Sequence, residues 1–490
     1  VAGTRIAHPP LRRKSPLFHY PDQLIVGNAP HVGVLDLPGT IRRPPIRLFF
    51  PATTVTPPPT STGKLATLPK LPKPANYFVD NRAAYILQGF AHVVFARHTT
   101  KLYRWILRPL MWLLSLVFPA RFLNIPGTMH VKTAKDAKAV KYMPPSELEL
   151  KPNANGAKEE DGNNDNAAES TQQNSNSEQT QSLIVFSHGL TGTGEENSIY
   201  CAFLAKRGHV VASLHHRDGS SCRVPMPDGT CKYYQHLPTG DDYSPNHRLE
   251  QIHARAQEFL YATSWLLGET ETEIETSSTS TSKVNVKHED DLQPIIDQIR
   301  SGLDRIKVTA AGFSYGAATA SLAATLEPTK YQCAILLDGW FHIDFSSRGV
   351  EFDFPPEAFG NDWPKIGKEA NANGSSGDDD HGNVDKKRRK GLNVPSLFLN
   401  SSQFRGYKKL WGATERLADQ INRNSMTQQQ QQQQPTDMYV VPHTHHQNFC
   451  DVIFWLPRRI SKKFFGLGDA NAYDAYETIL ERTIQFLERF

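Results

Sequence analysis

The chain has 490 residues, with 54 Lys and Arg against 50 Asp and Glu, so its formal net charge is only +4. This near balance excludes nucleic acid as the main partner, because proteins that bind nucleic acids carry a strong basic excess. The five cysteines exclude a disulfide scaffold, and the absence of any C-x-x-C pair argues against a structural zinc site.

The cysteines fall into two groups. Cys222 and Cys231 are close enough in sequence to form a small disulfide loop, and the sequence leaves open whether they pair. The other three stand in apolar runs and are expected to be buried thiols, namely Cys201, Cys333 and Cys450.

Four segments are too polar to join a hydrophobic core, so we expect them to be disordered inserts. At about 150 residues per domain the length alone suggests about three domains, but removing the inserts leaves roughly 400 residues, which suits one large domain. We therefore expect an N-terminal extension over residues 1–30 and a single domain over residues 31–490. The inserts lie near residues 152–182, 269–290, 367–391 and 423–435.

Residues 101–118 are strongly apolar but include basic side chains. The longest uncharged run, Pro109–Ala120, has 12 residues, whereas a helix needs about 20 to span a bilayer. Tryptophans beside basic residues favour a helix in the headgroup region, and the alternatives are a buried core helix and a true membrane anchor. The side chains expected to contact lipid are Trp105, Leu110, Trp112, Leu113 and Leu114.

Between the inserts, short apolar strands alternate with helical patterns. The predicted strands cover residues 183–186, 209–214, 306–311, 333–337, 395–400 and 438–441. The predicted helices cover residues 198–207, 248–267, 315–326 and 473–490. Continuous apolar strands separated by helices indicate a mostly parallel central sheet with helices on both faces, which is the α/β class.

The motif G-x-S-x-G occurs at residues 312–316, between a predicted strand and a predicted helix. By composition alone a chain of this length contains about 0.15 such matches, so the pentapeptide by itself is a weak signal. Its position is typical of a nucleophile elbow, in which a sharp turn presents Ser314 above the sheet. The alternative is a serine in an ordinary tight turn.

A serine nucleophile needs a base and an orienting carboxylate, and both are expected beyond the carboxyl ends of parallel strands. Asp338 follows a predicted strand, 24 residues after Ser314, with Asp344 as a competing acid further into the loop. Three histidines follow a later strand, at positions 443, 445 and 446. The order Ser, Asp, His is that of the α/β-hydrolase fold.

The oxyanion of a tetrahedral intermediate needs two backbone donors. One is expected from the residue after the nucleophile, Tyr315, and the other from the loop that follows the strand at 183–186, where residues 187–190 read Ser-His-Gly-Leu. A glycine turn without a catalytic part is the alternative for this loop.

Five segments occur in the order seen in the platelet-activating-factor acetylhydrolases of the plasma and cytosolic type II forms, the group VII phospholipases A2. The chain resembles this family from about Val32 to its C-terminal helix, apart from the inserts. The segments are VFSHGL (185–190), HHRDGS (215–220), GFSYGAAT (312–319), LLDGW (336–340) and HHQNF (445–449).

The resemblance implies that Ser314 is the nucleophile, Asp338 the acid and His446 the base, with the amides of Leu190 and Tyr315 as oxyanion donors. His446 is preferred to the other two histidines because it alone precedes Gln-Asn-Phe. Two positions depart from the family pattern, since Phe313 stands where His is usual and Gly339 where Ala is usual.

The family likeness implies a calcium-independent serine esterase that removes a short or oxidised sn-2 acyl group from phospholipids at a membrane or lipoprotein surface. It implies no metal or other cofactor. Trp340, Gln447 and Phe313 lie next to triad members and are candidate substrate-pocket residues, with structural packing as the alternative. The alternative functions are a general carboxylesterase or polyester hydrolase, and a catalytically silent lipid-binding protein of the same fold. The sequence indicates no oligomeric state.

Overall fold

The structure is a computed structural model. It describes residues 29–40, 42–55, 72–77, 124–125, 127–144, 147–148, 181–236, 245–269, 283–345, 350–353, 392–426, 436–455 and 466–490, with isolated residues at 89, 109 and 462.

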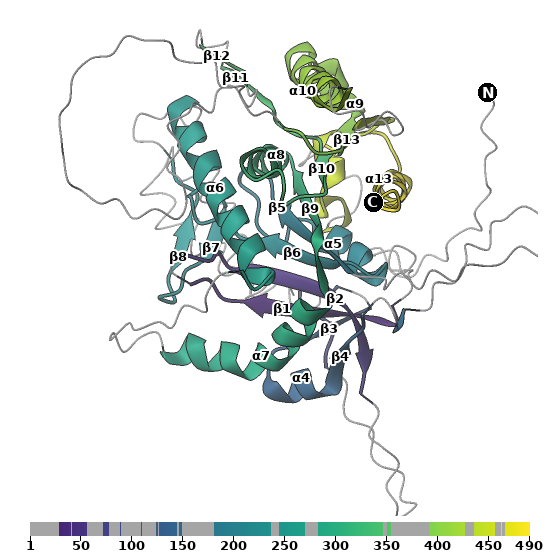
Figure 1. Cartoon of the computed structure of the whole chain (residues 1–490). Helices are drawn as coiled ribbons and strands as arrows, with labels where there is room; N and C mark the ends of the chain where they lie inside the picture. Colours follow the sequence, from purple (N-terminus) through teal and green to yellow (C-terminus); the bar gives the residue numbers. More distant parts are fainter. Residues whose placement is uncertain are drawn as a thin grey trace, which may run out of the picture.

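A ten-stranded sheet in the described part forms the centre of the molecule, in the order β14-β13-β10-β9-β5-β6-β2-β1-β3, with β4 beside β2 (Figure 1). Pairing is parallel from β6 to β14, and β2 runs antiparallel to β6, β1 and β4. Its strands are β1 (His31–Leu37), β2 (Ile46–Thr54), β3 (Thr128–His130), β4 (Val140–Tyr142), β5 (Gln181–Ser187), β6 (Val210–Leu214), β9 (Leu303–Phe313), β10 (Cys333–Leu337), β13 (Ser396–Ser401) and β14 (Thr436–Val441).

Two short hairpins stand apart from this sheet. They are formed by β7 (Arg223–Pro225) with β8 (Cys231–Tyr233), and by β11 (His342–Phe345) with β12 (Val350–Asp353).

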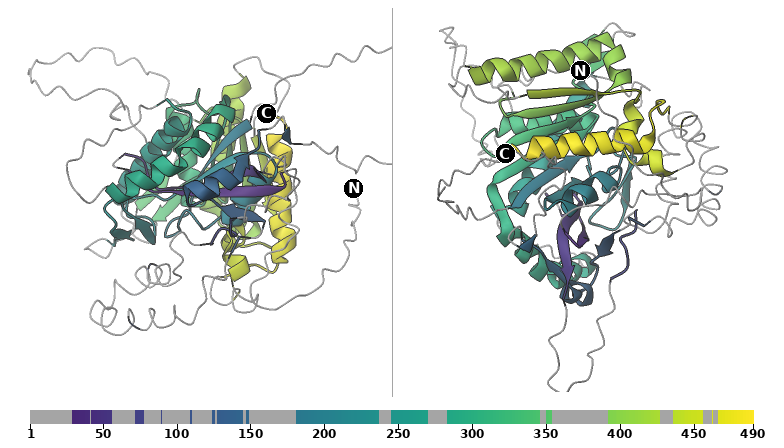
Figure 2. Two further views of the ribbon diagram at one scale, coloured as in Figure 1. Left: turned by 90° about the horizontal axis from the view of Figure 1, so that it is seen from below. Right: turned by 90° about the vertical axis from the view of Figure 1, so that its right-hand side faces the viewer.

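Helices cover both faces of the sheet. Helices α5 and α13 lie across the sheet from α6 and α8 (Figure 1, and Figure 2, left). The helices are α4 (Ala134–Ala139), α5 (Ser198–Lys206), α6 (Pro245–Leu266), α7 (Lys283–Gly302), α8 (Tyr315–Leu326), α9 (Ser402–Gly406), α10 (Lys408–Met426), α11 (Val452–Trp455), the 3-10 helix η7 (His446–Phe449) and α13 (Ala472–Leu487).

The alternation of side chains along the parallel strands produces two hydrophobic cores. On β5, Leu183 and Val185 belong to the core that also contains side chains of α6, α7, α8 and α10, whereas Ile184 and Phe186 belong to the core with side chains of α5 and α13. Successive strand residues point to opposite faces, so a strand that is apolar throughout is buried on both sides. The predicted α/β-hydrolase architecture, a mostly parallel sheet between two helical layers, is confirmed.

The insert boundaries predicted from composition are partly wrong. β5 already begins at Gln181, α10 continues to Met426, and α7 begins at Lys283, inside the segment predicted as an insert over residues 269–290. The sequence of the first turns of α7 is mostly polar, and Leu292, Ile295, Ile296 and Ile299 of its second half are buried. The prediction from polar composition was therefore wrong about the start of α7.

All five cysteines are free thiols. Cys201, Cys333 and Cys450 are buried, as predicted. Cys222 and Cys231 do not form a disulfide: Cys222 immediately precedes β7, whereas Cys231 begins β8, and its sulfur accepts a hydrogen bond from Arg223 Nη2 at 2.9 Å.

Candidate active site

Ser314 occupies a strained turn between β9 and α8. Its φ of 57° lies in the left-handed region that a residue with a side chain rarely adopts. A Cβ atom at Gly312 would overlap the carbonyl oxygen of Gly316, and one at Gly316 would overlap the carbonyl oxygen of Ser187. Only glycine permits the turn to be this tight and lets the end of β5 lie against the first turn of α8.

A hydrogen-bonded chain joins Ser314, His446 and Asp338. The Ser314 hydroxyl lies 2.9 Å from His446 Nε2, and His446 Nδ1 lies 2.7 Å from Asp338 Oδ2. Asp338 and His446 are 24 and 132 positions from Ser314 along the chain, yet they follow β10 and β14 at the same edge of the parallel sheet. Beyond the carboxyl ends of parallel strands is where α/β proteins place functional groups.

The surroundings of Asp338 fix the tautomer of His446. The buried carboxylate also accepts hydrogen bonds from the Ser401 amide at 2.7 Å and the Ser401 hydroxyl at 2.8 Å. An ionised carboxylate only accepts, so Nδ1 of His446 carries the proton and Nε2 is left to accept one from Ser314. The arrangement can therefore transfer the hydroxyl proton of Ser314 to His446.

Aromatic rings hold the imidazole of His446. The Phe313 and Phe404 rings stack on it with centroid distances of 4.8 and 5.6 Å, and the Trp340 ring lies 6.0 Å away. The His446 amide also donates to Gln403 Oε1 at 2.9 Å. The structure thus brings His446 to Ser314, whereas His445 Nδ1 lies 2.8 Å from the Gly466 carbonyl oxygen.

Each of the three candidate pocket residues has a different setting near the hydrogen-bonded chain of Ser314, His446 and Asp338. Phe313 is only 1% exposed, and the Trp340 amide donates to the Ser314 carbonyl oxygen at 3.1 Å. The Gln447 side-chain oxygen accepts from the Cys450 thiol at 3.3 Å. Their contact with a substrate stays a prediction.

The candidate oxyanion donors lie on the two segments that Gly316 brings together. Tyr315 is the first residue of α8, so its N–H has no acceptor within the helix. Leu190 lies in the turn after β5, where the Gly192 amide donates to the Gly189 carbonyl oxygen at 3.2 Å. Among the residues the structure describes, the Leu190 amide donates no hydrogen bond to the backbone.

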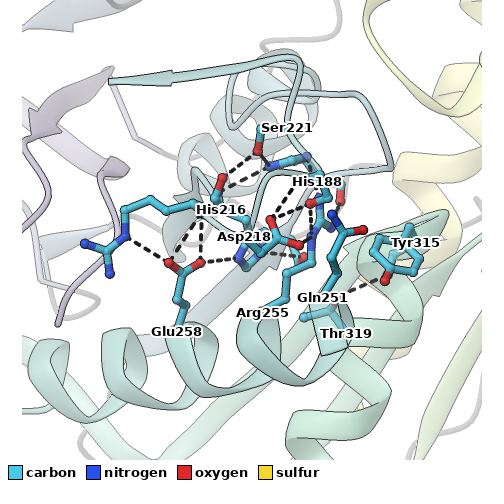
Figure 3. A network of polar contacts seen from close by, with 12 residues as sticks. His188, His216, Asp218, Ser221, Gln251, Arg255, Glu258, Tyr315 and Thr319 are labelled. Carbon is cyan, nitrogen blue, oxygen red and sulfur yellow. Dashed lines mark hydrogen bonds and ion pairs between the residues drawn. The ribbon is translucent and has the colours of Figure 1, made fainter. Parts of the chain in front are cut away.

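A buried polar network lies beneath this turn (Figure 3). It includes His188, His216 and Asp218 from two of the segments that resemble the family, but no motif pointed to the α6 side chain at its centre. Arg255 of α6 reaches the backbone of the turn, with its guanidinium completely buried. It stands on the same helical stripe as Ile252, Ala256 and Phe259. Arg248 and Gln251 are also buried in this helix, so charged and polar residues among its apolar positions were the signal that could have marked the network.

A second Ser-His-carboxylate chain lies within this network. Ser187 Oγ lies 2.8 Å from His216 Nε2, and His216 Nδ1 lies 3.0 Å from Glu258 Oε2. Burial, and then the charge of Arg255, lower the pKa of His216. Because Ser187 and His216 are completely buried, a substrate has no access to them. The serine, histidine and carboxylate of this second chain therefore have a structural role.

The turn also contacts Glu196, which is half-buried and lies near the buried carboxyl group of Asp451. Burial raises the pKa of Glu196 to about 7, against the opposing effect of a hydrogen bond from the Gly189 amide at 3.1 Å. Burial likewise raises the pKa of Asp451 to about 7, although the carboxyl accepts from the Tyr77 and Tyr476 hydroxyls. Both groups are neutral over part of the physiological pH range.

The predicted lipid-contacting side chains, Trp105, Leu110, Trp112, Leu113 and Leu114, lie outside the described residues. No helix within the described ranges is both long and apolar enough to cross a membrane. Within the same ranges no three His, Cys, Asp or Glu side chains gather as a metal site would require.

A family model described as platelet-activating factor acetylhydrolase, isoform II, matches residues 160–344 and 383–490, which is more than half of the chain. The chain belongs to this family. A platelet-activating factor acetylhydrolase from dog (Canis lupus familiaris) is 33% identical over 170 residues, covering 32% of this chain and 35% of the relative. One from chicken (Gallus gallus) is 24% identical over 325 residues, covering 63% and 61%.

The match thus spans about a third of the length of the mammalian relatives. Among solved structures, a ferulic acid esterase from Streptomyces cinnamoneus has a TM-score of 0.45 at 15% identity, covering 94% of this chain and 89% of that one. A likeness at this level carries no argument about function.

Proposed function

We propose that this protein is a calcium-independent serine esterase that hydrolyses the short or oxidised sn-2 acyl ester of phospholipids. The observation that supports it most directly is the chain of hydrogen bonds from Ser314 through His446 to Asp338, at 2.9 and 2.7 Å. A strained elbow presents the serine, and the base is already oriented by a buried carboxylate. Family membership supports an ester as the substrate.

In the proposed reaction, Ser314 Oγ attacks the sn-2 carbonyl carbon while His446 Nε2 accepts the hydroxyl proton. The amides of Leu190 and Tyr315 stabilise the oxyanion. Collapse of the tetrahedral intermediate breaks the bond to the glycerol oxygen, which takes the proton from His446 and leaves as the lysophospholipid. Water then transfers a proton to His446 and attacks the acyl-serine. Collapse breaks the bond to Ser314 Oγ, which takes the proton back from His446, and releases the carboxylic acid.

The test compares two phosphatidylcholines, one with an sn-2 acetyl group and one with a long sn-2 chain, in the presence of EDTA. The wild type should hydrolyse the acetyl substrate only. Ser314→Ala should lower kcat by about 10⁴-fold or more, as loss of a serine nucleophile does. Retention of most turnover by Ser314→Ala would overturn the assignment of the nucleophile.

Other outcomes favour the alternatives. Cleavage of a soluble nitrophenyl ester but of neither lipid would favour a general carboxylesterase or polyester hydrolase. Binding of lipid vesicles without hydrolysis of any of the three esters would favour a catalytically silent lipid-binding protein.

The proposed partner is a phospholipid at a membrane or lipoprotein surface, approached through residues 101–118. The tryptophans and basic residues of this segment suit the headgroup region. Replacing Trp105 and Trp112 together by Ala should weaken binding to phosphatidylcholine vesicles and leave hydrolysis of the nitrophenyl ester unchanged. Equal vesicle binding by the variant and the wild type would exclude this segment as the lipid contact.

A further inference from the structure

We infer that Arg255 is a positioning residue for the oxyanion site. Its side chain binds the peptide group between Gly189 and Leu190, and the N–H of Leu190 is one of the two proposed oxyanion donors. This inference rests on the proposed function, since it concerns a donor of that reaction. It adds a residue that lies 59 positions before Ser314 in the chain and outside the five motifs quoted above.

Arg255 reaches the turn from below, out of α6 (Figure 3). Its Nη1 donates to the His188 carbonyl oxygen at 2.7 Å, and its Nη2 donates to the Gly189 carbonyl oxygen at 3.3 Å. The Nε atom donates to Ser220 Oγ at 2.7 Å, which fixes the plane of the guanidinium. One planar fork thus holds two successive peptide carbonyls.

The Gly189 carbonyl and the Leu190 N–H belong to the same peptide group. In a trans peptide these two groups point in opposite directions, so holding the carbonyl toward Arg255 directs the N–H away from it. A charged donor on the carbonyl also polarises the peptide, which makes its N–H a stronger donor. Arg255 therefore sets both the direction and the strength of the Leu190 donor.

The turn is held from other sides as well. His188 Nδ1 lies 2.7 Å from the Gly189 carbonyl oxygen, and Glu196 accepts from the Gly189 amide at 3.1 Å. Burial lowers the pKa of His188 well below its usual value, so this imidazole is neutral. Arg255 is consequently the charged donor on this peptide.

Arg255 also contacts the residue that supplies the second donor. Its guanidinium lies over the Tyr315 ring, 4.9 Å from the centroid. The Tyr315 hydroxyl in turn donates to the Arg248 carbonyl oxygen on α6 at 2.6 Å, which fixes the ring. One side chain thus contacts both segments that carry the proposed oxyanion donors.

A role in packing alone is a weak explanation for this residue. Burying a guanidinium has a large desolvation cost, and an apolar side chain on the same stripe of α6 would avoid it. Asp218 compensates part of that cost, with Oδ2 3.5 Å from Arg255 Nε. The compensated charge is placed against two peptide carbonyls of the turn.

The test compares Arg255→Lys with the matched variant Arg248→Lys. Arg248 is also buried in α6, but its guanidinium nitrogens donate to the side chains of Gln251 and Tyr234. Both variants keep the positive charge and lose the planar fork. We expect Arg255→Lys to lower kcat for the sn-2 acetyl substrate by about 10- to 100-fold with KM changed less than about threefold, somewhat below the loss of a whole oxyanion donor.

A trifluoromethyl ketone, which forms a tetrahedral adduct with the serine, supplies a second readout. Its inhibition constant should rise in Arg255→Lys by the same factor as kcat falls, whereas Arg248→Lys should change both by less than about threefold. Thermal unfolding of both variants checks that they fold.

The outcomes separate this inference from the proposed function. If ester hydrolysis depends on Ser314 but Arg255→Lys and Arg248→Lys are equally active, the inference fails and the proposed function stands. If hydrolysis by the wild type does not depend on Ser314, the proposed function fails first. If Arg255→Lys does not fold, Ser220→Ala is the second variant. It removes one hydrogen bond of the same guanidinium without removing a charge, and it should lower kcat by about 3- to 10-fold, the size of one hydrogen bond. An unchanged kcat would then overturn the inference.

Discussion

The Phe313 ring stacks on the His446 imidazole, with centroids 4.8 Å apart and planes inclined by 27°. Phe313 immediately precedes Ser314, so the residue that orients the base is covalently next to the nucleophile. Through this contact, the departure from the family pattern at position 313 acts on the geometry of the base.

Replacing Phe313 by Ala should remove that stacking surface and leave a cavity. We expect the free energy of unfolding to fall by about 3–5 kcal/mol and kcat for the sn-2 acetyl substrate to fall about 10- to 100-fold because the imidazole is less well oriented. Phe313→His keeps a planar ring and should recover most of kcat. Chemical denaturation and steady-state kinetics measure both, and a Phe313→Ala variant with full kcat would show that the stacking does not orient the base.

Ser314 and Ser187 each lie within hydrogen-bond distance of a histidine Nε2, so their alanine variants can be compared directly. Ser314→Ala should abolish hydrolysis with little effect on stability, whereas Ser187→Ala should lower the free energy of unfolding by about 1–3 kcal/mol, because it leaves the buried His216 without a partner at Nε2. Its kcat should stay within a few-fold of the wild type. A nitrophenyl ester assay and urea unfolding distinguish the two, and loss of turnover in Ser187→Ala alone would reverse the roles of the two serines.

Glu196 should make stability depend on pH. Its pKa is raised from 4.5 to about 7, mainly by burial, so between these pH values the folded protein keeps a proton that the unfolded chain releases. Stability from this group is present below about pH 4.5 and is lost as the pH rises through 7, by up to about 3 kcal/mol. Asp451 acts in the same direction.

Glu196→Gln removes this titration and keeps an acceptor for the Gly189 amide. The difference in unfolding free energy between pH 5 and pH 8 should therefore be smaller in the variant than in the wild type, by up to about 3 kcal/mol. Urea denaturation at the two pH values measures it. An equal loss of stability in both proteins would show that Glu196 is already ionised at pH 5.

Gly316 should tolerate no side chain. A Cβ there would overlap the Ser187 carbonyl oxygen, and neither backbone segment can move without disturbing the turn or β5. Gly316→Ala should lower the free energy of unfolding by about 3 kcal/mol or more and impair activity. Gly406→Ala, where nothing lies within 4 Å of the added atom, is the control and should be close to neutral. Similar melting temperatures for the two variants would contradict the close approach.

The sequence predicted the parts of this protein that are encoded locally. The bounds expected for α8 and β10 match the structure, because each is a continuous apolar run with a clear stop. The order Ser, Asp, His followed from strand ends, and the family resemblance selected His446 among three histidines. The structure brings Ser314, Asp338 and His446 together.

Features that depend on tertiary packing were not predicted. β1 and β2 were not identified as strands, and α7 was partly assigned to an insert. Arg255 contacts backbone 67 residues away, and no local pattern specifies which loop a buried arginine will reach. A charged residue at a buried position of a helix indicates that it has a polar partner, but it does not indicate which residue that partner is.

The placement of the acid has a consequence for refolding. Asp338 is fixed by Ser401 at the end of β13 and by His446 after β14, residues 63 and 108 positions away. Both contacts close long loops, which form slowly because the chain must first bring distant segments together. Turnover that depends on this chain of hydrogen bonds cannot return before the last parallel strand has docked. Recovery of esterase activity after denaturation should therefore lag behind recovery of helical circular dichroism.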